Sequence, residues 1–76
     1  MMPPEEVKTM LQEAFPDARI EVRDMTGTGD HFDIQITSDV FAHKSIVQQH
    51  QMVYKALEGE MDRRIHAVQI KTRSVP

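Results

Sequence analysis

The chain contains no cysteine among its 76 residues, which excludes disulfide bonds and any metal site built from its own thiolates. It also lacks tryptophan and has one tyrosine and three phenylalanines, so its core must be assembled mainly from aliphatic side chains. No apolar run approaches the roughly 20 residues of a membrane span. The amino-terminal segment MMPPEEVK is acidic where a signal peptide would be basic and then apolar. We therefore expect a cytoplasmic protein with a single small domain over residues 1–76.

The charge balance argues against nonspecific binding of nucleic acid. The formal net charge is −3 at pH 7, whereas such binding depends on neutralising phosphates with lysine and arginine. A local basic cluster near the carboxyl end is the contrary signal, and it consists of Arg63, Arg64, Lys71 and Arg73. Clusters of this kind are usually solvated faces, so DNA binding through these residues is kept as the alternative function.

Hydrophobic periodicity predicts two amphipathic helices. The first extends over Pro4–Phe15, where proline suits the first turn and Pro16-Asp17 ends the helix. The second extends over Lys44–Leu57 and has the longest helical pattern in the chain. Its buried stripe is predicted to consist of Ile46, His50, Val53 and Leu57. Its glutamines are expected to lie largely on the solvent side: Gln48, Gln49 and Gln51.

Alternation with a period of two residues predicts three strands. Strands at Arg19–Asp24 and Phe32–Thr37 flank the loop Thr26–Asp30, which contains two glycines, and should form an antiparallel hairpin. The third strand is predicted over Ile65–Arg73, after a brief helix or turn at Met61–Arg64. The connection from the second strand to the third is long and helical, which favours a right-handed crossover to a parallel neighbour.

The order of these elements predicts an α+β fold, α-β-β-α-α-β, whose three-stranded mixed sheet is covered on one face by helices. In this topology the second and third strands begin at the same edge of the sheet. His31 immediately precedes the alternation of the second strand, and His66 stands at the start of the third. Because neighbouring strands lie about 4.8 Å apart, the two imidazoles are predicted to converge on one ligand or ion. An antiparallel third strand would instead put His66 at the opposite edge.

Two segments of the sequence resemble the BolA family. The run FAHKSIVQQHQMVYKAL begins at Phe41, and the run IHAVQIKTRS begins at Ile65. They are similar, in order and spacing, to the family pattern F-x-G-K-S-x-V-x-x-H-x-x-V-Y-x-x-L followed by I-H-A-x-x-x-K-T. The GTGDHF loop is similar to that of the IbaG-like (YrbA-like) branch. The chain departs from the pattern at His43, where the family has glycine, and at Gln49 and Gln51, where basic residues are frequent.

The resemblance implies a fold similar to the type II KH topology, which agrees with the order of elements deduced from periodicity. It implies a monothiol (CGFS-type) glutaredoxin as partner, with a 2Fe–2S cluster shared between the two proteins. The resemblance implies that His66 corresponds to the ligand histidine of the family's carboxyl-terminal strand. The family's second ligand, cysteine or histidine according to the branch, comes from the loop before the second strand, where this chain has His31. In the family, the glutaredoxin cysteine and glutathione supply the sulfur ligands. Family members have also been treated as stress-linked transcriptional regulators with a helix-turn-helix-like surface.

Imidazole chemistry is compatible with this assignment. Two histidines replace two cysteines on one iron of Rieske-type centres, in which the cluster has four protein ligands. This chain offers at most two well-placed nitrogens and no thiolate, so a partner must complete any such cluster. Because a histidine ligand is neutral, the shared cluster should weaken below about pH 6, near the ordinary imidazole pKa.

The remaining candidate residues are interpreted as structural. His50 lies on the predicted apolar face and is taken as a packing residue, and His43 as an exposed turn residue. No nucleophile–base pair or phosphate-binding glycine motif is recognisable, so we do not expect an enzyme. KH-like domains bind single strands through a GxxG loop, and the matching segment here, Leu57–Met61, carries two acids. The sequence predicts a non-enzymatic iron–sulfur trafficking adaptor and leaves open whether it forms a homodimer.

Overall fold

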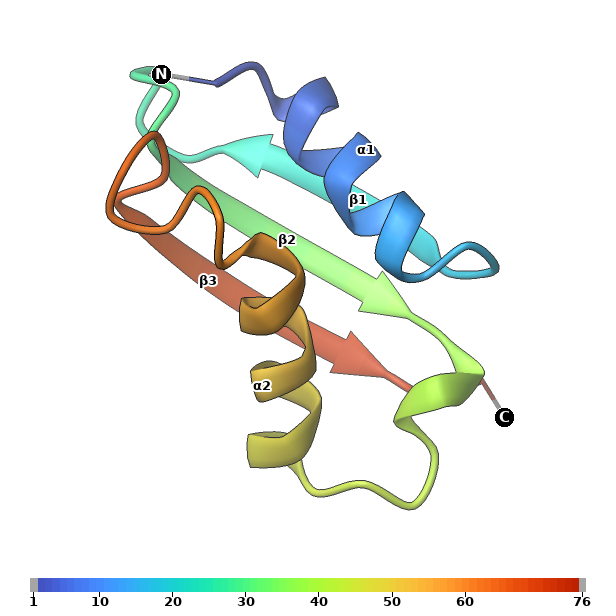
Figure 1. Cartoon of the computed structure of the whole chain (residues 1–76). Coiled ribbons are helices and arrows are strands. Elements are labelled where there is room, and N and C mark those ends of the chain that lie inside the picture. Colours follow the sequence, from blue (N-terminus) through green and yellow to red (C-terminus); the bar gives the residue numbers. More distant parts are fainter. Residues whose placement is uncertain (1, 76) are drawn as a thin grey trace.

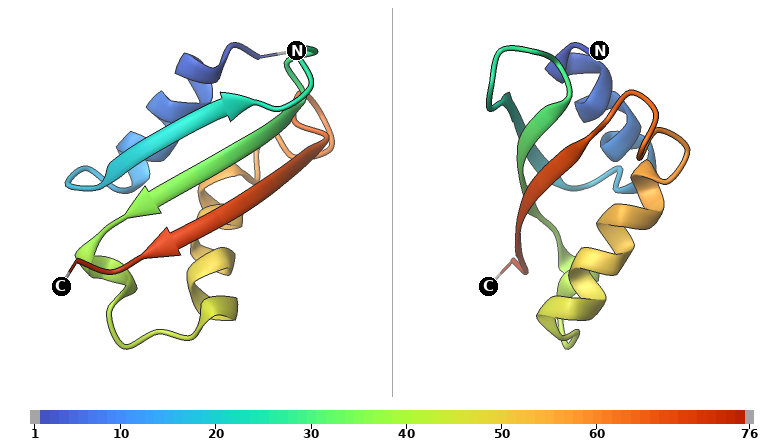
Figure 2. Two further views of the ribbon diagram at one scale, coloured as in Figure 1. Left: turned by 180° about the vertical axis from the view of Figure 1, so that it is seen from behind. Right: turned by 90° about the vertical axis from the view of Figure 1, so that its left-hand side faces the viewer.

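The computed structural model describes residues 2–75, and two helices pack there on one face of a three-stranded sheet (Figure 1). The elements are α1 (Pro4–Ala14), β1 (Arg19–Asp24), β2 (His31–Thr37), the 3₁₀ turn η1 (Asp39–Phe41), α2 (Ile46–Leu57) and β3 (Ala67–Arg73). Seen from behind, the opposite face of the sheet carries no helix (Figure 2). The α+β class predicted from the sequence is therefore confirmed.

The segment predicted as a brief helix or turn takes the second of these forms, and a short helical element lies earlier in the chain. The segment at Met61–Arg64 folds as a turn, closed by an isolated bridge between Met61 and Ile65. The short element is η1, which precedes α2 and buries Phe41 to 1% exposure. No helix among residues 2–75 is long and apolar enough to cross a membrane.

The sheet has the order β1-β2-β3, with β2 in the centre. β1 runs antiparallel to β2, with Val22 opposite Ile34. β3 runs parallel to β2, with His31 opposite Ala67. The crossover through α2 therefore has the predicted direction, and β2 and β3 begin at the same edge of the sheet.

Alternate residues of the strands face the helices and form the core with them. The strand pattern explains this arrangement, because successive side chains of a strand point to opposite faces. The buried apolar residues are Met2, Val7, Leu11, Phe15, Ile20, Phe32, Ile34, Ile36, Phe41, Val53, Leu57 and Ile65. Three of them come from β2, which is central and therefore the most completely covered strand.

The buried face of α2 differs from the predicted stripe. Ile46 is 59% exposed and His50 is only partly buried, whereas Val53 and Leu57 are fully buried. The third buried residue of α2 is Gln49, whose exposed fraction is 9%. Successive side chains of an α-helix point in directions about 100° apart. Because Gln49 is buried in place of His50, the first turns of α2 are rotated about the helix axis relative to the predicted orientation.

Hydrogen bonds explain why a glutamine is tolerated in this buried position. The Gln49 amide donates to the carbonyl oxygens of Phe41 (3.2 Å) and Lys44 (2.9 Å). Its oxygen accepts a hydrogen bond from the hydroxyl of Thr72. The side chain thus joins α2 to η1, to the loop after it and to β3, and a pattern that counts glutamine only as polar does not detect this.

The loop before α2 contains the residue that departs from the family pattern, His43. Its φ is 62°, which lies in the left-handed region that glycine adopts most readily. Ser45 then begins the helix by a capping box: its hydroxyl accepts from the Gln48 N–H (3.1 Å), and the Gln48 side chain accepts from the Ser45 N–H (2.9 Å). The helix therefore starts two residues later than the sequence pattern suggested.

An ion-pair network ties the turn before β3 to α1. The Arg64 guanidinium donates to the carboxylates of Glu6, at 2.6 Å, and of Glu60. The hydrogen bond from Arg64 lowers the pKa of the Glu60 carboxyl from its ordinary value of 4.5. A depressed folded-state pKa means that this pair stabilises the fold above that value, and that the stabilisation is lost as the pH falls through the lowered pKa.

Replacing Arg64 with glutamine is expected to return the Glu60 titration midpoint toward 4.5. The unfolding free energy should fall at pH 7, where the carboxylate is ionised, and should match that of the wild type in acid, where Glu60 is protonated in both proteins. Carboxyl carbon chemical shifts followed by NMR give the midpoint, and urea unfolding gives the stability. The matched control is Arg73→Gln, an exposed arginine toward the far end of β3. Equal midpoints in the wild type and Arg64→Gln would contradict this account.

Candidate metal centre

The parallel strands β2 and β3 bring two histidines to one edge of the sheet. His31 is the first residue of β2, and His66 immediately precedes β3. Their ring centroids lie 5.1 Å apart, with the ring planes inclined by 52°. His66 is exposed, and the His31 side chain is 35% exposed. The predicted convergence of the two imidazoles is therefore present, whereas their role as metal ligands stays a prediction.

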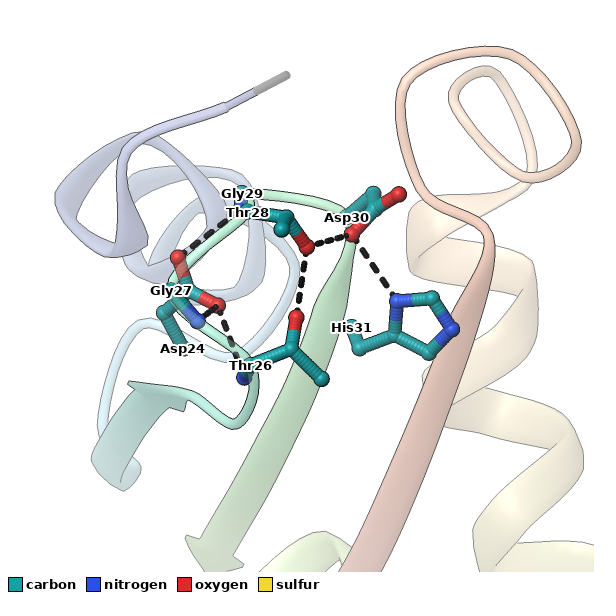
Figure 3. A network of polar contacts seen from close by, with 7 residues as sticks. All are labelled: Asp24, Thr26, Gly27, Thr28, Gly29, Asp30 and His31. Atoms are coloured by element: carbon teal, nitrogen blue, oxygen red, sulfur yellow. Dashed lines mark hydrogen bonds and ion pairs between the residues drawn. The ribbon is translucent and has the colours of Figure 1, made fainter.

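Asp30 contacts both histidines through different groups. Its main-chain carbonyl oxygen accepts hydrogen bonds from the N–H groups of His66 (2.7 Å) and Ala67 (3.1 Å). One carboxylate oxygen, Oδ1, lies 2.8 Å from Nδ1 of His31. The same oxygen accepts a hydrogen bond from the Thr28 hydroxyl (Figure 3). These contacts, Thr28 first and His31 second, hold the pKa of the Asp30 carboxyl below its ordinary value.

The loop before β2 is organised by the carboxylate of Asp24. It accepts hydrogen bonds from the backbone N–H groups of Thr26 (3.2 Å), Gly27 (2.9 Å) and Gly29 (2.8 Å) (Figure 3). Gly27 and Gly29 have φ values of 77° and 74°, which only glycine adopts without strain. The donors that could otherwise cradle an anion are thus occupied by a side chain of the chain itself. This arrangement fits a structural loop that presents Asp30 and His31.

Replacing Asp24 with alanine is expected to loosen this loop, because three backbone donors lose a charged acceptor. The amide protons of Gly27 and Gly29 should exchange with solvent markedly faster, and the domain should lose about 1–2 kcal/mol of stability. Hydrogen exchange by NMR and urea unfolding measure the two effects. Asp17→Ala is the matched control, since Asp17 is an exposed aspartate in the turn after α1. Unchanged exchange at both glycines would contradict the role given to Asp24.

The basic residues of the alternative function lie at two places along the chain, before β3 and toward its far end, and their role in DNA binding stays a prediction. Arg64 is engaged by the carboxylates of Glu6 and Glu60 in the turn before β3. Lys71 and Arg73 are exposed residues toward the far end of β3. They belong to the helix-free face, because the alternate residue Thr72 is the one that contacts α2. Most of the length of β3 therefore separates the two halves of the supposed patch, Arg63 and Arg64 from Lys71 and Arg73.

The side chains at the histidine edge provide too few ligands for this chain to hold a metal ion by itself. Among the residues that the structure describes, no three histidine, aspartate or glutamate side chains gather closely enough to hold one, and the sequence has no cysteine. Two neighbouring, solvent-accessible imidazoles nevertheless fit part of the ligand set of an iron–sulfur cluster, since imidazole is a proven ligand of such iron.

Asp30 was missed as a candidate by reasoning from the sequence. Its carbonyl contact with His66 depends on the pairing of β2 with β3, which brings together residues far apart in the chain. A local signal did exist, because Asp30 directly precedes His31 and carboxylates are common partners of the histidine ring nitrogen that does not bind metal.

The mixed sheet, its parallel crossover and the paired histidines define a small α+β domain of the BolA type. The model of the family described as BolA-like protein matches residues 11–75. The chain therefore belongs to the BolA-like family.

Relatives share this sequence over most of its length. An uncharacterized protein of Rickettsia prowazekii, RP812, is 33% identical over 95% of this chain and 94% of its own. Human BolA-like protein 3 is 44% identical over 92% of this chain and 65% of its own. The Escherichia coli protein named DNA-binding transcriptional regulator BolA is 28% identical over 99% of this chain and 78% of its own. These similarities do not distinguish the IbaG-like branch from the rest of the family.

Solved structures share the fold. The BolA domain of SufE1 from Arabidopsis thaliana superposes with a TM-score of 0.83 at 28% identity, covering 93% of this chain and 89% of that one. The agreement extends the family assignment from sequence to the arrangement of helices and strands.

Proposed function

We propose that this chain is a non-enzymatic adaptor of iron–sulfur trafficking that pairs with a monothiol glutaredoxin and shares a 2Fe–2S cluster with it. The observation that supports the proposal is the pair of rings of His31 and His66, 5.1 Å apart at one accessible sheet edge. The cluster is the cargo of the pair of proteins. The chain contributes two imidazoles, and the partner contributes its cysteine and glutathione.

The chain's own residues prepare this edge for a partner. The main-chain N–H of His66 is held by Asp30, while its ring is exposed and free to turn toward a docked protein. His31 is held more firmly, because its ring contacts the Asp30 carboxylate. Neutral imidazole ligands raise the reduction potential of a 2Fe–2S centre relative to thiolates, which would distinguish the shared cluster from one held by thiolates alone.

The direct test is titration of the chain with a cluster-loaded monothiol glutaredoxin, followed by visible absorbance and by NMR of the labelled chain. We expect the absorbance spectrum to change until the two proteins are equimolar, with resonance shifts centred on His31, His66 and Asp30. Glutaredoxin with glutathione but without cluster is the control. An unchanged cluster spectrum, or shifts confined to the helix-free face of the sheet, would contradict the proposal.

The shared cluster is also expected to be sensitive to acid. A histidine ligand must be neutral, so the cluster should be lost faster below about pH 6, near the ordinary imidazole pKa. The measurement is the decay of visible absorbance of the mixed complex at several pH values between about 5 and 8. The cluster-bound glutaredoxin without this chain is the control, because it has no histidine ligand from the chain. Equal pH dependence of the two complexes would count against histidine ligation.

DNA binding is the second candidate, and the name of the Escherichia coli relative is the observation that favours it. In this chain Lys71 and Arg73 are exposed alternate residues of β3 and therefore lie on the same face of the sheet. Binding through them should weaken steeply with salt, and the double variant Lys71→Gln/Arg73→Gln should reduce that salt dependence. Affinity that is independent of salt, or unaffected by the double variant, would remove this surface from consideration.

A further inference from the structure

The side chain of Asp30 has a chemical property that bears on His31. An ionised carboxylate only accepts hydrogen bonds, and the ring nitrogen that faces it, Nδ1 of His31, lies 2.8 Å from Oδ1. The proton must therefore be on Nδ1 for this contact to be a hydrogen bond. In a neutral ring the other nitrogen, Nε2, then carries the lone pair.

We infer that Asp30 is a positioning residue, which holds the ring of His31 with Nδ1–H toward its carboxylate and so leaves Nε2 as the nitrogen able to bind a metal. Carboxylates in this relation to a histidine ligand fix both its tautomer and its orientation. The inference deepens the proposed function and rests on it, because it names the atom of His31 that would face the cluster.

The carboxylate is itself held in place from the loop. The Thr28 hydroxyl donates to the same oxygen, Oδ1, that contacts His31. The backbone around Thr28 is fixed in turn by the Asp24 carboxylate, which accepts from the N–H groups of Gly27 and Gly29 on either side of it. Figure 3 shows these contacts as one continuous network from Asp24 to His31. A side chain restrained in this way is suited to orient a ring.

His66 provides an internal control, because its hydrogen bond to Asp30 joins main-chain groups. The carbonyl oxygen of Asp30 accepts from the N–H groups of His66 and Ala67, and a side-chain substitution leaves that carbonyl in place. Changing the carboxyl group should therefore alter His31 and spare the placement of His66. A general loss of structure at this edge would affect both histidines.

The first experiment uses the free chain and needs no cluster. Long-range proton–nitrogen NMR at about pH 8.5, above the ordinary imidazole pKa, reports which ring nitrogen of each histidine carries the proton. We expect His31 to be protonated on Nδ1 in the wild type. In Asp30→Ala it should shift to Nε2, the nitrogen that carries the proton preferentially in a free neutral histidine. In Asp30→Asn it should stay on Nδ1, because the amide oxygen still accepts, and His66 should keep one tautomer throughout.

If the wild-type spectrum shows His31 protonated on Nε2, the inference is overturned. The test therefore does not depend on the folding of a variant. The same His31 tautomer in the wild type and in folded Asp30→Ala would also overturn it. A simultaneous change at His66 would show a collapse of the edge instead of the loss of one hydrogen bond, and would overturn it as well.

The second experiment separates this inference from the proposed function. In the complex with cluster-loaded glutaredoxin, Asp30→Ala should lose the cluster about 10–100-fold faster than the wild type, and Asp30→Asn should lie close to the wild type. If Asp30→Ala switches the tautomer while His31→Ala leaves the complex unchanged, the positioning by Asp30 stands and the ligand role of His31 fails. If His31→Ala weakens the complex while Asp30→Ala changes neither tautomer nor lifetime, the ligand role stands and the positioning fails.

Discussion

Replacing His66 with alanine is expected to change the visible spectrum of the mixed cluster complex and to shorten its lifetime by at least about tenfold. The physical reason is the loss of one nitrogen ligand at an edge where the chain offers only two. The substitution should leave the fold intact, because His66 is exposed and its main-chain N–H still donates to the Asp30 carbonyl. The effect should therefore appear in the complex and be absent from the unfolding curve of the free chain.

The control for this variant removes a different imidazole. His43 is exposed and lies in the loop before α2 with a φ of 62°, a conformation that asparagine tolerates better than alanine. His43→Asn is therefore expected to leave the spectrum and the lifetime of the complex unchanged. Absorbance, circular dichroism in the visible range and timed cluster loss provide the measurement. An unaltered spectrum together with an unaltered lifetime in His66→Ala would exclude His66 as a ligand.

The candidate site could be anticipated from the sequence because its geometry follows from topology. Period-two alternation located the strands, and the length of the connection between the second and third required a crossover. Parallel neighbours begin at the same edge, so the positions of His31 and His66 relative to their strands were sufficient to predict that they meet. This deduction required no knowledge of side-chain packing. The burial of the central strand can also be predicted from the local sequence, since Phe32, Ile34 and Ile36 alternate with polar residues.

The contacts that refine the site could not be anticipated in this way, because they join groups that are remote in sequence or whose direction depends on the backbone. Arg64 counted as part of a basic cluster until the structure showed Glu6 beside it, 58 residues away in the chain. Asp24, the last residue of β1, looks in the sequence like an ordinary aspartate before a turn. Its role depends on where the backbone N–H groups of Thr26, Gly27 and Gly29 lie. The orientation of α2 could not be predicted for the same reason. The helix buries a polar residue, Gln49, whose hydrogen-bond partners lie on three other segments.

A substitution of Gln49 therefore gives the clearest test of what holds α2 in its position against the sheet. Gln49→Leu places an apolar side chain of comparable size at this position and removes the hydrogen bonds. The carbonyl oxygen of Lys44 would lose its side-chain donor, and the hydroxyl of Thr72 would lose its acceptor. The carbonyl oxygen of Phe41 would lose one of its two donors and keep the Lys44 N–H, at 3.3 Å. An unsatisfied buried polar group costs about 1–3 kcal/mol, so the loss over this network should be about 2–4 kcal/mol. For a domain of this size that lowers Tm by roughly 10–30 °C.

The matched control is Gln51→Leu, the same substitution two residues further along the same helix, where the side chain is exposed. It should change the unfolding free energy by less than about 0.5 kcal/mol. Thermal and urea unfolding of the two variants and the wild type provide the comparison. If Gln49→Leu lowered the unfolding free energy no more than the control does, the hydrogen bonds of Gln49 would not be what holds α2 in its position. The buried apolar residues Val53 and Leu57 would then be sufficient to hold the helix against the sheet, and the glutamine would only fill space beneath it.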